Sequence, residues 1–345
     1  MKKYISIFLI LIISLFSFTG CNQSKQKFTD YSFDFFDTAS TIIGYETDEE
    51  TFKENCEKIK SWLLEYHELY DIYNSYDGIT NLCDINKSTG KTIKADPKII
   101  NLLQYAKQLY KKTDGKLNVA LGSVLSIWHN YRDYGLKHPE DATLPPENAL
   151  LDASNHTDIN DVIIDANANT VLIKDAKLSL DVGAIAKGYA AQKVAEQMEN
   201  AGMNGYLLNL GGNVKIVGKR DDGEKWQIGI ENPDRTSAEA YAEEMELDNN
   251  LSLVTSGSYQ RFYIVNGNNY HHIIDPETLL PAEYFTSVSV LCEDSALADG
   301  LSTALFCLNF EDGKKLLSQF EKVSVLWVTE GGKKLYYGDF EKYCK

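Results

Sequence analysis

The chain has 345 residues, of which 43% are hydrophobic, so we expect one large folded domain or two closely packed ones rather than a disordered protein. Its formal net charge is −16, from 34 basic and 50 acidic residues. Such an acidic surface repels nucleic-acid backbones, which argues against nucleic-acid binding. A small phosphorylated ligand stays possible, because a bound metal ion supplies local positive charge.

The N-terminus has the features of an export signal. Two lysines precede an apolar, uncharged run at residues 4–18, and a Thr-Gly pair stands directly before Cys21. This arrangement is typical of a secretory signal peptide, here residues 1–20, and resembles a bacterial lipidation motif. We therefore expect lipidation of Cys21, a tether over 21–30, and a location on the extracytoplasmic face of the cell membrane. The alternative is an uncleaved anchor helix, which also places the body outside the cytoplasm.

Helices are expected to dominate the first half of the main body, which spans residues 31–345. Apolar side chains recur at helical intervals between residues 48 and 73. Asp96 followed by Pro97 is typical of a helix start, because Asp caps the first amides and proline suits the first turn. The expected elements are a strand or hairpin arm at 31–45, helices at 48–73, 97–113 and 119–131, and a proline-containing surface loop at 136–158.

Short strands with few helices are expected in the second half. Helices are predicted at 183–202 and 295–308. The predicted strands are 161–164, 170–173, 178–180, 206–209, 213–217, 226–230, 243–254, 262–265, 287–292, 323–329 and 334–337. Because strands and helices do not alternate regularly, the pattern favours the α+β class over a doubly wound α/β fold.

A possible phosphate-binding turn lies in the sequence LSLDVGAIAKGY at residues 178–189. An apolar run ends on Asp181, small residues follow, and Lys187 comes one turn into the predicted helix. Backbone amides at the start of a helix favour an anion, and a lysine adds positive charge. The alternative is an ordinary connection between a strand and a helix, capped by Asp181.

A possible cation site lies in the predicted helix at 295–308. Asp299 and Thr303 are four residues apart, so both side chains lie on one face among apolar neighbours. A carboxylate and a hydroxyl suit a hard cation, Mg²⁺ before Zn²⁺. The alternative is an exposed Asp299, with the Thr303 hydroxyl bonded back to a helix carbonyl.

Two further segments have features of binding loops. The glycine pair in NLGGN at 209–213 allows close approach of a ligand to the backbone, or forms a plain tight turn. His271 and His272 are adjacent, so on a strand they point to opposite faces and at most one faces a given site. Two histidines without a third ligand nearby do not make a zinc site, and an isolated pair is more often structural.

Five segments, in this order, resemble the ApbE-type FAD:protein FMN transferases: LDVGAIAKGYA, NLGGNV, TSGSY, HHIIDP and ADGLSTALF. The resemblance covers roughly residues 33–317. It implies a single large α+β domain of mixed, mostly antiparallel sheets with flanking helices, and an FAD cleft between two lobes. It also implies an enzyme that uses FAD and Mg²⁺ and transfers FMN, by a phosphoester bond, to a Thr or Ser of an exported acceptor protein, releasing AMP.

The same resemblance implies roles for individual residues. Mg²⁺ would be held by the Ala184 carbonyl and the side chains of Asp299 and Thr303. His272 or Asp275 is a candidate for the base that accepts the proton of the attacking hydroxyl. The implied FAD contacts are Phe36, Tyr76, Lys116, Leu117, Asn118, Asp181, Lys187, His272 and Ile273.

Three positions depart from the family pattern. GKLN at 115–118 stands where GAFD is usual, Phe36-Asp37-Thr38 replaces Met-Gly-Thr, and Thr278 lacks its following glycine. None of these changes touches an expected metal ligand. Two alternative functions are an FAD pyrophosphatase, in which water replaces the hydroxyl, and a flavin- or solute-binding lipoprotein without catalytic activity.

Overall fold

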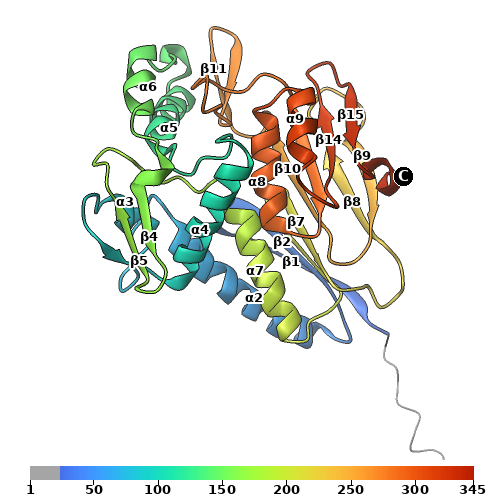
Figure 1. Ribbon diagram of the computed structural model, residues 1–345. Helices are drawn as coiled ribbons and strands as arrows, with labels where there is room; N and C mark the ends of the chain where they lie inside the picture. The colour runs from blue at the N-terminus through green and yellow to red at the C-terminus, as the bar shows by residue number, and fades with distance from the viewer. Residues whose placement is uncertain (1–23) are drawn as a thin grey trace, which may run out of the picture.

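The computed structural model describes residues 24–345, so the expected signal peptide and Cys21 lie outside the described residues. No helix in this part of the chain is long and apolar enough to cross a membrane. The main feature is an eight-stranded sheet in which every neighbouring pair is antiparallel (Figure 1). Its strand order is β1 (Gln26–Phe35), β2 (Thr38–Glu46), β6 (Tyr206–Leu210), β7 (Asn213–Val217), β10 (Ser252–Gly257), β13 (Ser287–Cys292), β14 (Ser324–Val328) and β15 (Lys334–Tyr337).

One face of this sheet is covered by three helices, α2 (Glu49–Tyr70), α7 (Ala186–Asn200) and α8 (Ser295–Phe306). Helix α8 packs on β10, β13 and α7, and α2 packs on α7 and the β1–β2 hairpin. Helix α2 begins where predicted, because the Asp48 carboxylate accepts a hydrogen bond from Thr51 N at 2.8 Å. The predicted α+β class is therefore confirmed.

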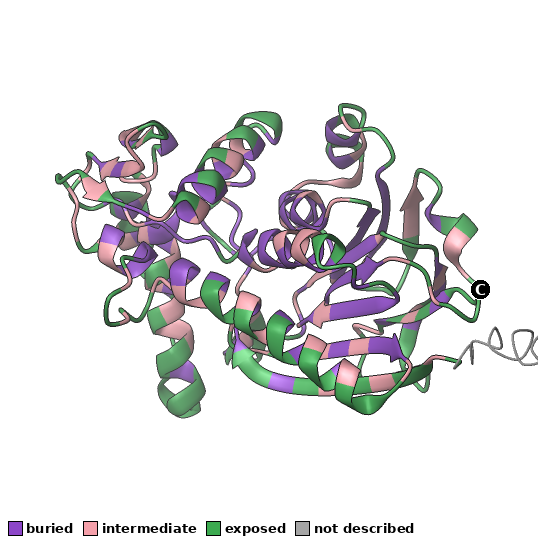
Figure 2. Cartoon of the chain, turned by 90° about the horizontal axis from the view of Figure 1, so that it is seen from below, coloured by how far each residue is buried: buried purple, intermediate pink, exposed green. Residues whose placement is uncertain are grey.

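The opposite face of the sheet is covered by a two-stranded hairpin, β8 (Trp226–Glu231) and β9 (Tyr241–Leu247). Alternate residues of the sheet strands face the two sides, as the period of a strand requires. Leu207 and Leu253 join the hairpin's Trp226 in one apolar cluster, whereas Leu208 and Val254 belong to the cluster beneath the helices. Figure 2 shows how strongly burial concentrates in the central strands.

A second lobe stands beside the helical face (Figure 1). It contains a three-stranded sheet, several helices and a hairpin that packs on α5. Its elements are α3 (Leu82–Asn86), β3 (Ile93–Lys94), α4 (Pro97–Lys112), α5 (Gly122–Lys137), α6 (Glu147–Ser154), β4 (Val162–Asp165), β5 (Thr170–Ile173), β11 (Phe262–Val265) and β12 (Asn268–His271). Helix α9 (Phe310–Leu317) follows α8 in the first lobe.

Three predicted elements are wrong in detail. The loop expected at 136–158 contains the end of α5 and all of α6, whose Leu150 and Ala153 are buried. The strand expected at 243–254 is two strands, β9 and β10, which belong to different sheets. Strand β1 already begins at Gln26, inside the expected tether, because its residues pair with β2.

The strand expected at 178–180 does not form. Leu178 and Leu180 are buried, which gave the alternating pattern, but no neighbouring strand pairs with them among the described residues. The Asn86 side chain takes that place, accepting from Leu180 N at 2.8 Å and donating to Leu180 O at 2.9 Å. An amide side chain thus satisfies backbone groups that would otherwise need a strand partner.

Candidate functional site

A cleft opens between the two lobes, and we call it the main cleft. Its walls come from α5, the turn before α7, the turn between β6 and β7, helix α8 and the segment after β12. An adjoining side pocket shares Tyr73, Asp181, Gly183, Lys187 and Arg261 with it. The main cleft is lined by ten of the residues named from the sequence: Lys116, Leu117, Asn118, Asp181, Ala184, Lys187, His272, Ile273, Asp299 and Thr303.

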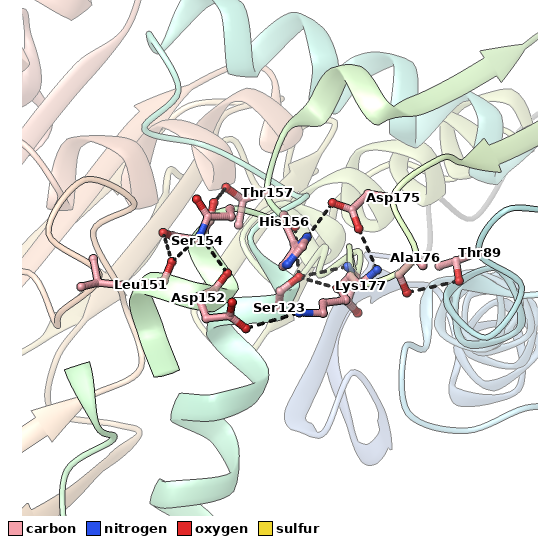
Figure 3. A network of polar contacts seen from close by, with 12 residues as sticks. Thr89, Ser123, Leu151, Asp152, Ser154, His156, Thr157, Asp175, Ala176 and Lys177 are labelled. Atoms are coloured by element: carbon pink, nitrogen blue, oxygen red, sulfur yellow. Dashed lines mark hydrogen bonds and ion pairs between the residues drawn. The ribbon is translucent and has the colours of Figure 1, made fainter. Parts of the chain in front are cut away.

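The loop that leads to Asp181 is fixed by a polar network on its outer side (Figure 3). Nδ1 of His156 lies 2.7 Å from an Asp175 oxygen, and Asp175 also accepts from Lys177 N at 2.8 Å. The Ser123 hydroxyl donates to the carbonyls of His156 and Lys177. Because this hydroxyl bonds backbone oxygens rather than the imidazole, Ser123, His156 and Asp175 are a structural clamp and not a nucleophilic triad.

The turn at 181–187 is capped by Asp181, as considered from its sequence, and it also lines the cavities. Asp181 accepts a hydrogen bond from Gly183 N at 2.9 Å, so it caps the turn locally, yet it also lines both cavities. Its own amide is held by Val119 O at 2.8 Å. Lys187 Nζ lies 3.4 Å from Gly183 O, which puts the ammonium group at the mouth of the turn.

Asp299 is the most deeply buried acid of the main cleft, with 4% of its surface exposed. Its Oδ2 accepts from Gly188 N at 2.7 Å. Burial raises the pKa of Asp299, and the Lys187 charge and hydrogen bonds from Gly188 and Asn213 partly counteract that rise. A buried carboxylate whose charge is this poorly compensated is suited to binding a cation.

The donor set near Asp299 fits a magnesium ion. Thr303 follows one turn later on α8, and Ala184 faces the same cleft from the turn before α7. A carboxylate, a hydroxyl and a backbone carbonyl are all oxygen donors, which Mg²⁺ prefers. Within residues 24–345, no three His, Cys, Asp or Glu side chains cluster as a metal site by themselves. A backbone or hydroxyl ligand would therefore be required here.

Asn213, at the start of β7, is a cleft residue to which the sequence analysis assigned no role. It is 2% exposed, and its side chain lies close enough to Asp299 to favour the ionised form of that carboxyl and lower its pKa. Its Oδ1 has no hydrogen-bond partner in the described part of the chain, and such an orphan acceptor is costly when buried. The turn before it is set by Asn209, whose side chain accepts from Gly212 N at 2.9 Å. The motif NLGGN was visible in the sequence, but the contact with Asp299 was not.

The adjacent histidines have separate roles. Both ring nitrogens of His271 are used, since Nε2 lies 2.8 Å from Ala282 O and Nδ1 accepts from Ile273 N. His272 lines the main cleft, and its Nδ1 lies 3.2 Å from Arg261 O. Because a carbonyl only accepts, Nδ1 of His272 carries the proton and Nε2 keeps a free lone pair.

The charge state of His272 suits proton acceptance. Burial, together with the nearby charges of Arg261, His271 and Lys187, lowers the pKa of His272 to about 3. The imidazole is therefore neutral at physiological pH. An anionic ligand in the cleft would offset these cations and raise the pKa, which would make the ring a better base when substrate is bound.

Asp275 does not lie where a general base is needed. It does not line the main cleft, it is buried, and its two oxygens lie 3.0 and 3.3 Å from Lys116 Nζ. Glu277 lies 3.1 Å from the same ammonium group. Because the charge of Asp275 is committed to an ion pair, His272 is the better placed of the two candidate bases, and a catalytic role of Asp275 stays a prediction. The pair instead keeps Lys116 in the cleft wall at the position where the sequence departs from the family pattern.

The aromatic residues near the cleft also require a correction. Phe36 lines the side pocket, where its amide donates to His67 Nδ1 at 3.2 Å. Tyr76 lines neither cavity, and its hydroxyl donates at 2.8 Å to Oδ2 of Asp71, a residue in the wall of the side pocket. Tyr73, three residues earlier, lines both cavities, and its hydroxyl oxygen lies 3.2 Å from His129 Nδ1. Tyr73, rather than Tyr76, is therefore the tyrosine that a ligand in these cavities would meet.

One face of α5 and an arginine from the hairpin region supply cleft residues that the sequence analysis missed. Leu125, His129 and Arg132 recur at helical spacing and face the cleft. Arg261 reaches across to donate to Asp37 O at 3.1 Å. The spacing on α5 was readable, but only the fold indicates that this face is open to the cleft. Arg132 and Arg261, together with Lys187, form a positively charged region in the cleft of an acidic protein, where an anion can bind.

Known proteins resemble this chain over most of its length. A model of the ApbE family matches residues 36–327. An FAD:protein FMN transferase of Haemophilus influenzae is 29% identical over 319 residues, which cover 89% of this chain and 88% of that protein. Another, of Treponema pallidum, is 32% identical over 262 residues, which cover 72% of this chain and 70% of that protein.

Solved structures resemble it as well. The ApbE protein of Thermotoga maritima superposes with a TM-score of 0.80 at 25% identity, covering 93% of this chain and all of that one. The flavin transferase ApbE from Vibrio cholerae has a TM-score of 0.76 at 24% identity, covering 92% of this chain and 99% of that one. The second likeness concerns the fold alone.

Proposed function

The chain belongs to the ApbE family, and from that premise we propose that it is a Mg²⁺-dependent FAD:protein FMN transferase. One observation carries the proposal. The buried Asp299 carboxylate, the Thr303 hydroxyl and the Ala184 segment line the same cleft as Lys187 and His272. An acidic protein thereby gathers oxygen ligands for a cation and positive side chains for a dinucleotide in one place.

The Ala184 carbonyl, Asp299 and Thr303 would hold the ion. When bound, Mg²⁺ neutralises phosphate charge and stabilises the leaving group of a phosphoryl transfer. Asn213 keeps the Asp299 carboxylate oriented, as residues behind metal ligands commonly do. Lys187 and the turn amides after Asp181 bind the pyrophosphate of FAD, and Tyr73 and Phe36 offer aromatic surfaces to the flavin.

In the transfer, the hydroxyl oxygen of the acceptor's Thr or Ser forms a bond to the phosphorus of the FMN half. The bond between that phosphorus and the bridging oxygen breaks, and AMP leaves with the bonding electrons. The hydroxyl proton passes to Nε2 of His272, which Arg261 O holds in the required tautomer. Arg132 and Arg261 lie along the same cleft and stabilise the charge that develops on the phosphoryl oxygens.

Incubation of the protein with FAD, Mg²⁺ and exported proteins of the same cell tests the proposal. A transferase yields a protein whose mass increases by that of an FMN moiety, together with AMP. Free FMN and AMP without a modified protein would favour the FAD pyrophosphatase. Intact FAD in every reaction would favour a binding protein without catalytic activity.

We also propose that the protein is lipid-anchored through Cys21 on the extracytoplasmic face of the membrane. The apolar run at 4–18 and the Thr-Gly-Cys sequence support this location. Membrane fractionation of wild type and Cys21→Ser tests it. Release of the variant from the membrane is expected, and retention of the variant would favour the uncleaved anchor helix.

A further inference from the structure

A third cavity, of about 550 Å³, lies on the face of the central sheet opposite α7 and α8. We call it the hairpin groove. Its floor is formed by β2, β6, β7 and β10, and one wall is formed by β8 and Tyr241 of β9. None of the residues named for FAD, the metal ion or proton transfer lines it.

The side chains on the floor of the hairpin groove change from apolar to polar along its length. Ile43 on β2 lies opposite Leu207 on β6, and one step nearer the main cleft Thr41 lies opposite Asn209. On β10, Leu253 is likewise followed by Thr255 on the same face. The groove is therefore apolar at its far end and polar at the end that meets the main cleft.

The hairpin groove and the main cleft adjoin each other. Thr38, Gly211, Thr255 and Gln260 line both the hairpin groove and the main cleft. They meet at the turn between β6 and β7, where Gly211 has a φ of +58° and an added Cβ would lie 2.0 Å from Thr38 Oγ1. A glycine is required there because its φ is positive and the Thr38 side chain occupies the place of a Cβ, so groove and cleft adjoin where Thr38 packs on Gly211.

The wall of the groove offers an unpaired strand edge. In the described chain β8 pairs only with β9, and its five residues 227–231 all line the groove. The Tyr241 ring lies against Gly229, because a Cβ added to Gly229 would be 2.3 Å from Tyr241 Cδ1. Half of the Tyr241 surface is exposed. A free edge beside an aromatic surface is a site where an extended segment of another protein can add as a strand.

We propose that the hairpin groove binds an extended segment of the acceptor protein and guides its hydroxyl residue across the Gly211 turn into the main cleft. This inference rests on the proposed transferase function. On β2 the floor runs from Ala39 to Ile43, which is five residues and four residue-to-residue steps. At about 3.3 Å per residue, the apolar end of the floor lies ~13 Å from the turn. The bound segment therefore carries an apolar side chain about four residues from its Thr or Ser.

Charge further limits the segment. Of the described residues that line the groove, Glu231 alone is charged. A neutral or basic segment complements it, whereas an acidic residue near Glu231 would be repelled. The partner is therefore an extended, neutral or basic segment with one hydroxyl residue and one apolar anchor.

Synthetic 13-residue peptides with a single central Thr, and with one Leu moved through the other positions, test this inference on the full-length protein. FMN on the peptide is measured by mass spectrometry, and FAD affinity by flavin fluorescence. The wild type should prefer Leu about four residues from the Thr by roughly tenfold, since burying such a side chain contributes about 1.5–3 kcal/mol. Equal modification at all Leu positions would overturn the groove assignment.

Substitutions in the groove distinguish its role in peptide binding from the role of the main cleft in FAD binding. Tyr241→Ser and Ile228→Ser should lower peptide kcat/KM at least fivefold without changing FAD affinity. Tyr284→Ser is the matched control, because Tyr284 is also 50% exposed and lines none of these cavities. Glu231→Lys should reverse the preference from basic to acidic peptides.

If these variants modify peptides like wild type, the groove is not the acceptor site. If the wild type modifies no peptide and cleaves no FAD, the transferase function fails and the groove assignment with it.

Discussion

The carboxylate of Asp299 accepts a hydrogen bond from the amide of Gly188 at 2.7 Å, although the two residues are 111 positions apart. Helices α7 and α8 approach so closely here that a Cβ on Gly188 would lie 2.4 Å from Asp299 Cβ and 2.3 Å from Ser295 O. The glycine in AKGY is thus explained by packing and not by turn formation. This contact joins the turn that we assign to FAD to the acid that we assign to the metal ion.

Gly188→Ala should therefore damage both stability and activity. Overpacking against a backbone carbonyl typically costs about 1–3 kcal/mol, and here the shift would also displace Asp299. Urea denaturation measures the loss. Gly331→Ala is the control, because an added Cβ there would meet nothing within 4 Å. A Gly188→Ala protein with unchanged stability would contradict the close approach of the helices.

Asp299→Asn should abolish magnesium-dependent turnover. Removing a ligand charge forfeits several kcal/mol of transition-state stabilisation, which corresponds to roughly a hundredfold loss or more. Magnesium binding, followed by isothermal titration calorimetry, should weaken in parallel. Asp294→Asn makes the same chemical change at the cap of the same helix, where the side chain oxygen still accepts from Ala296 N, and should behave like wild type. Equal Mg²⁺ affinity in both variants would refute the metal assignment.

Asn213→Ala should weaken magnesium binding without removing a metal ligand. Loss of a residue that orients a ligand typically costs about 10–100-fold in metal affinity. At saturating Mg²⁺, turnover should largely recover, which a general folding defect would not permit. Asn209→Ala removes a hydrogen bond from the same turn but not the contact with Asp299. If both variants require the same Mg²⁺ concentration, Asn213 does not position Asp299.

Tyr73→Ala should weaken FAD binding more than Tyr76→Ala. Tyr73 lines both cavities, whereas Tyr76 lines neither and its hydroxyl donates to Asp71 in the wall of the side pocket. An aromatic contact contributes about 1 kcal/mol beyond its buried area, so FAD affinity should fall roughly fivefold or more. Flavin fluorescence titration distinguishes the two. A larger effect at Tyr76 would restore the assignment made from the sequence.

Stability should fall as pH decreases below neutrality. Burial lowers the pKa of His129 and His271 in the fold, so both rings stay neutral at a pH where the unfolded chain already binds protons. Their contribution is complete above about pH 6.5 and is lost as pH falls toward the folded pKa, by up to ~1.4 kcal/mol per pH unit for each ring. Urea midpoints from pH 7.5 to 5 measure the slope. His271→Asn should flatten it, and the exposed His138→Asn should not.

The sequence determined the fold class and most elements, because those depend on local signals. Asp48 and Asp96 cap the helices that follow them, and apolar spacing marked α2, α4 and α8. The resemblance to the ApbE family, which five ordered motifs carry, identified ten residues that line one cleft. Where local signals failed, a distant group had replaced the expected partner, as the Asn86 side chain does for the strand predicted at 178–180.

Only the tertiary structure decided which of two similar residues faces the cleft. Tyr73 and Tyr76 are the same residue type only three positions apart, and His271 and His272 are adjacent, so the sequence does not distinguish the members of either pair. Their roles differ because Asp71 holds one tyrosine and Ala282 holds one histidine elsewhere. Asp275 was equally plausible as a base until Lys116, 159 positions away, proved to be its partner. Hydrogen bonds and ion pairs between distant residues fix side-chain direction, and no local pattern in the sequence encodes them.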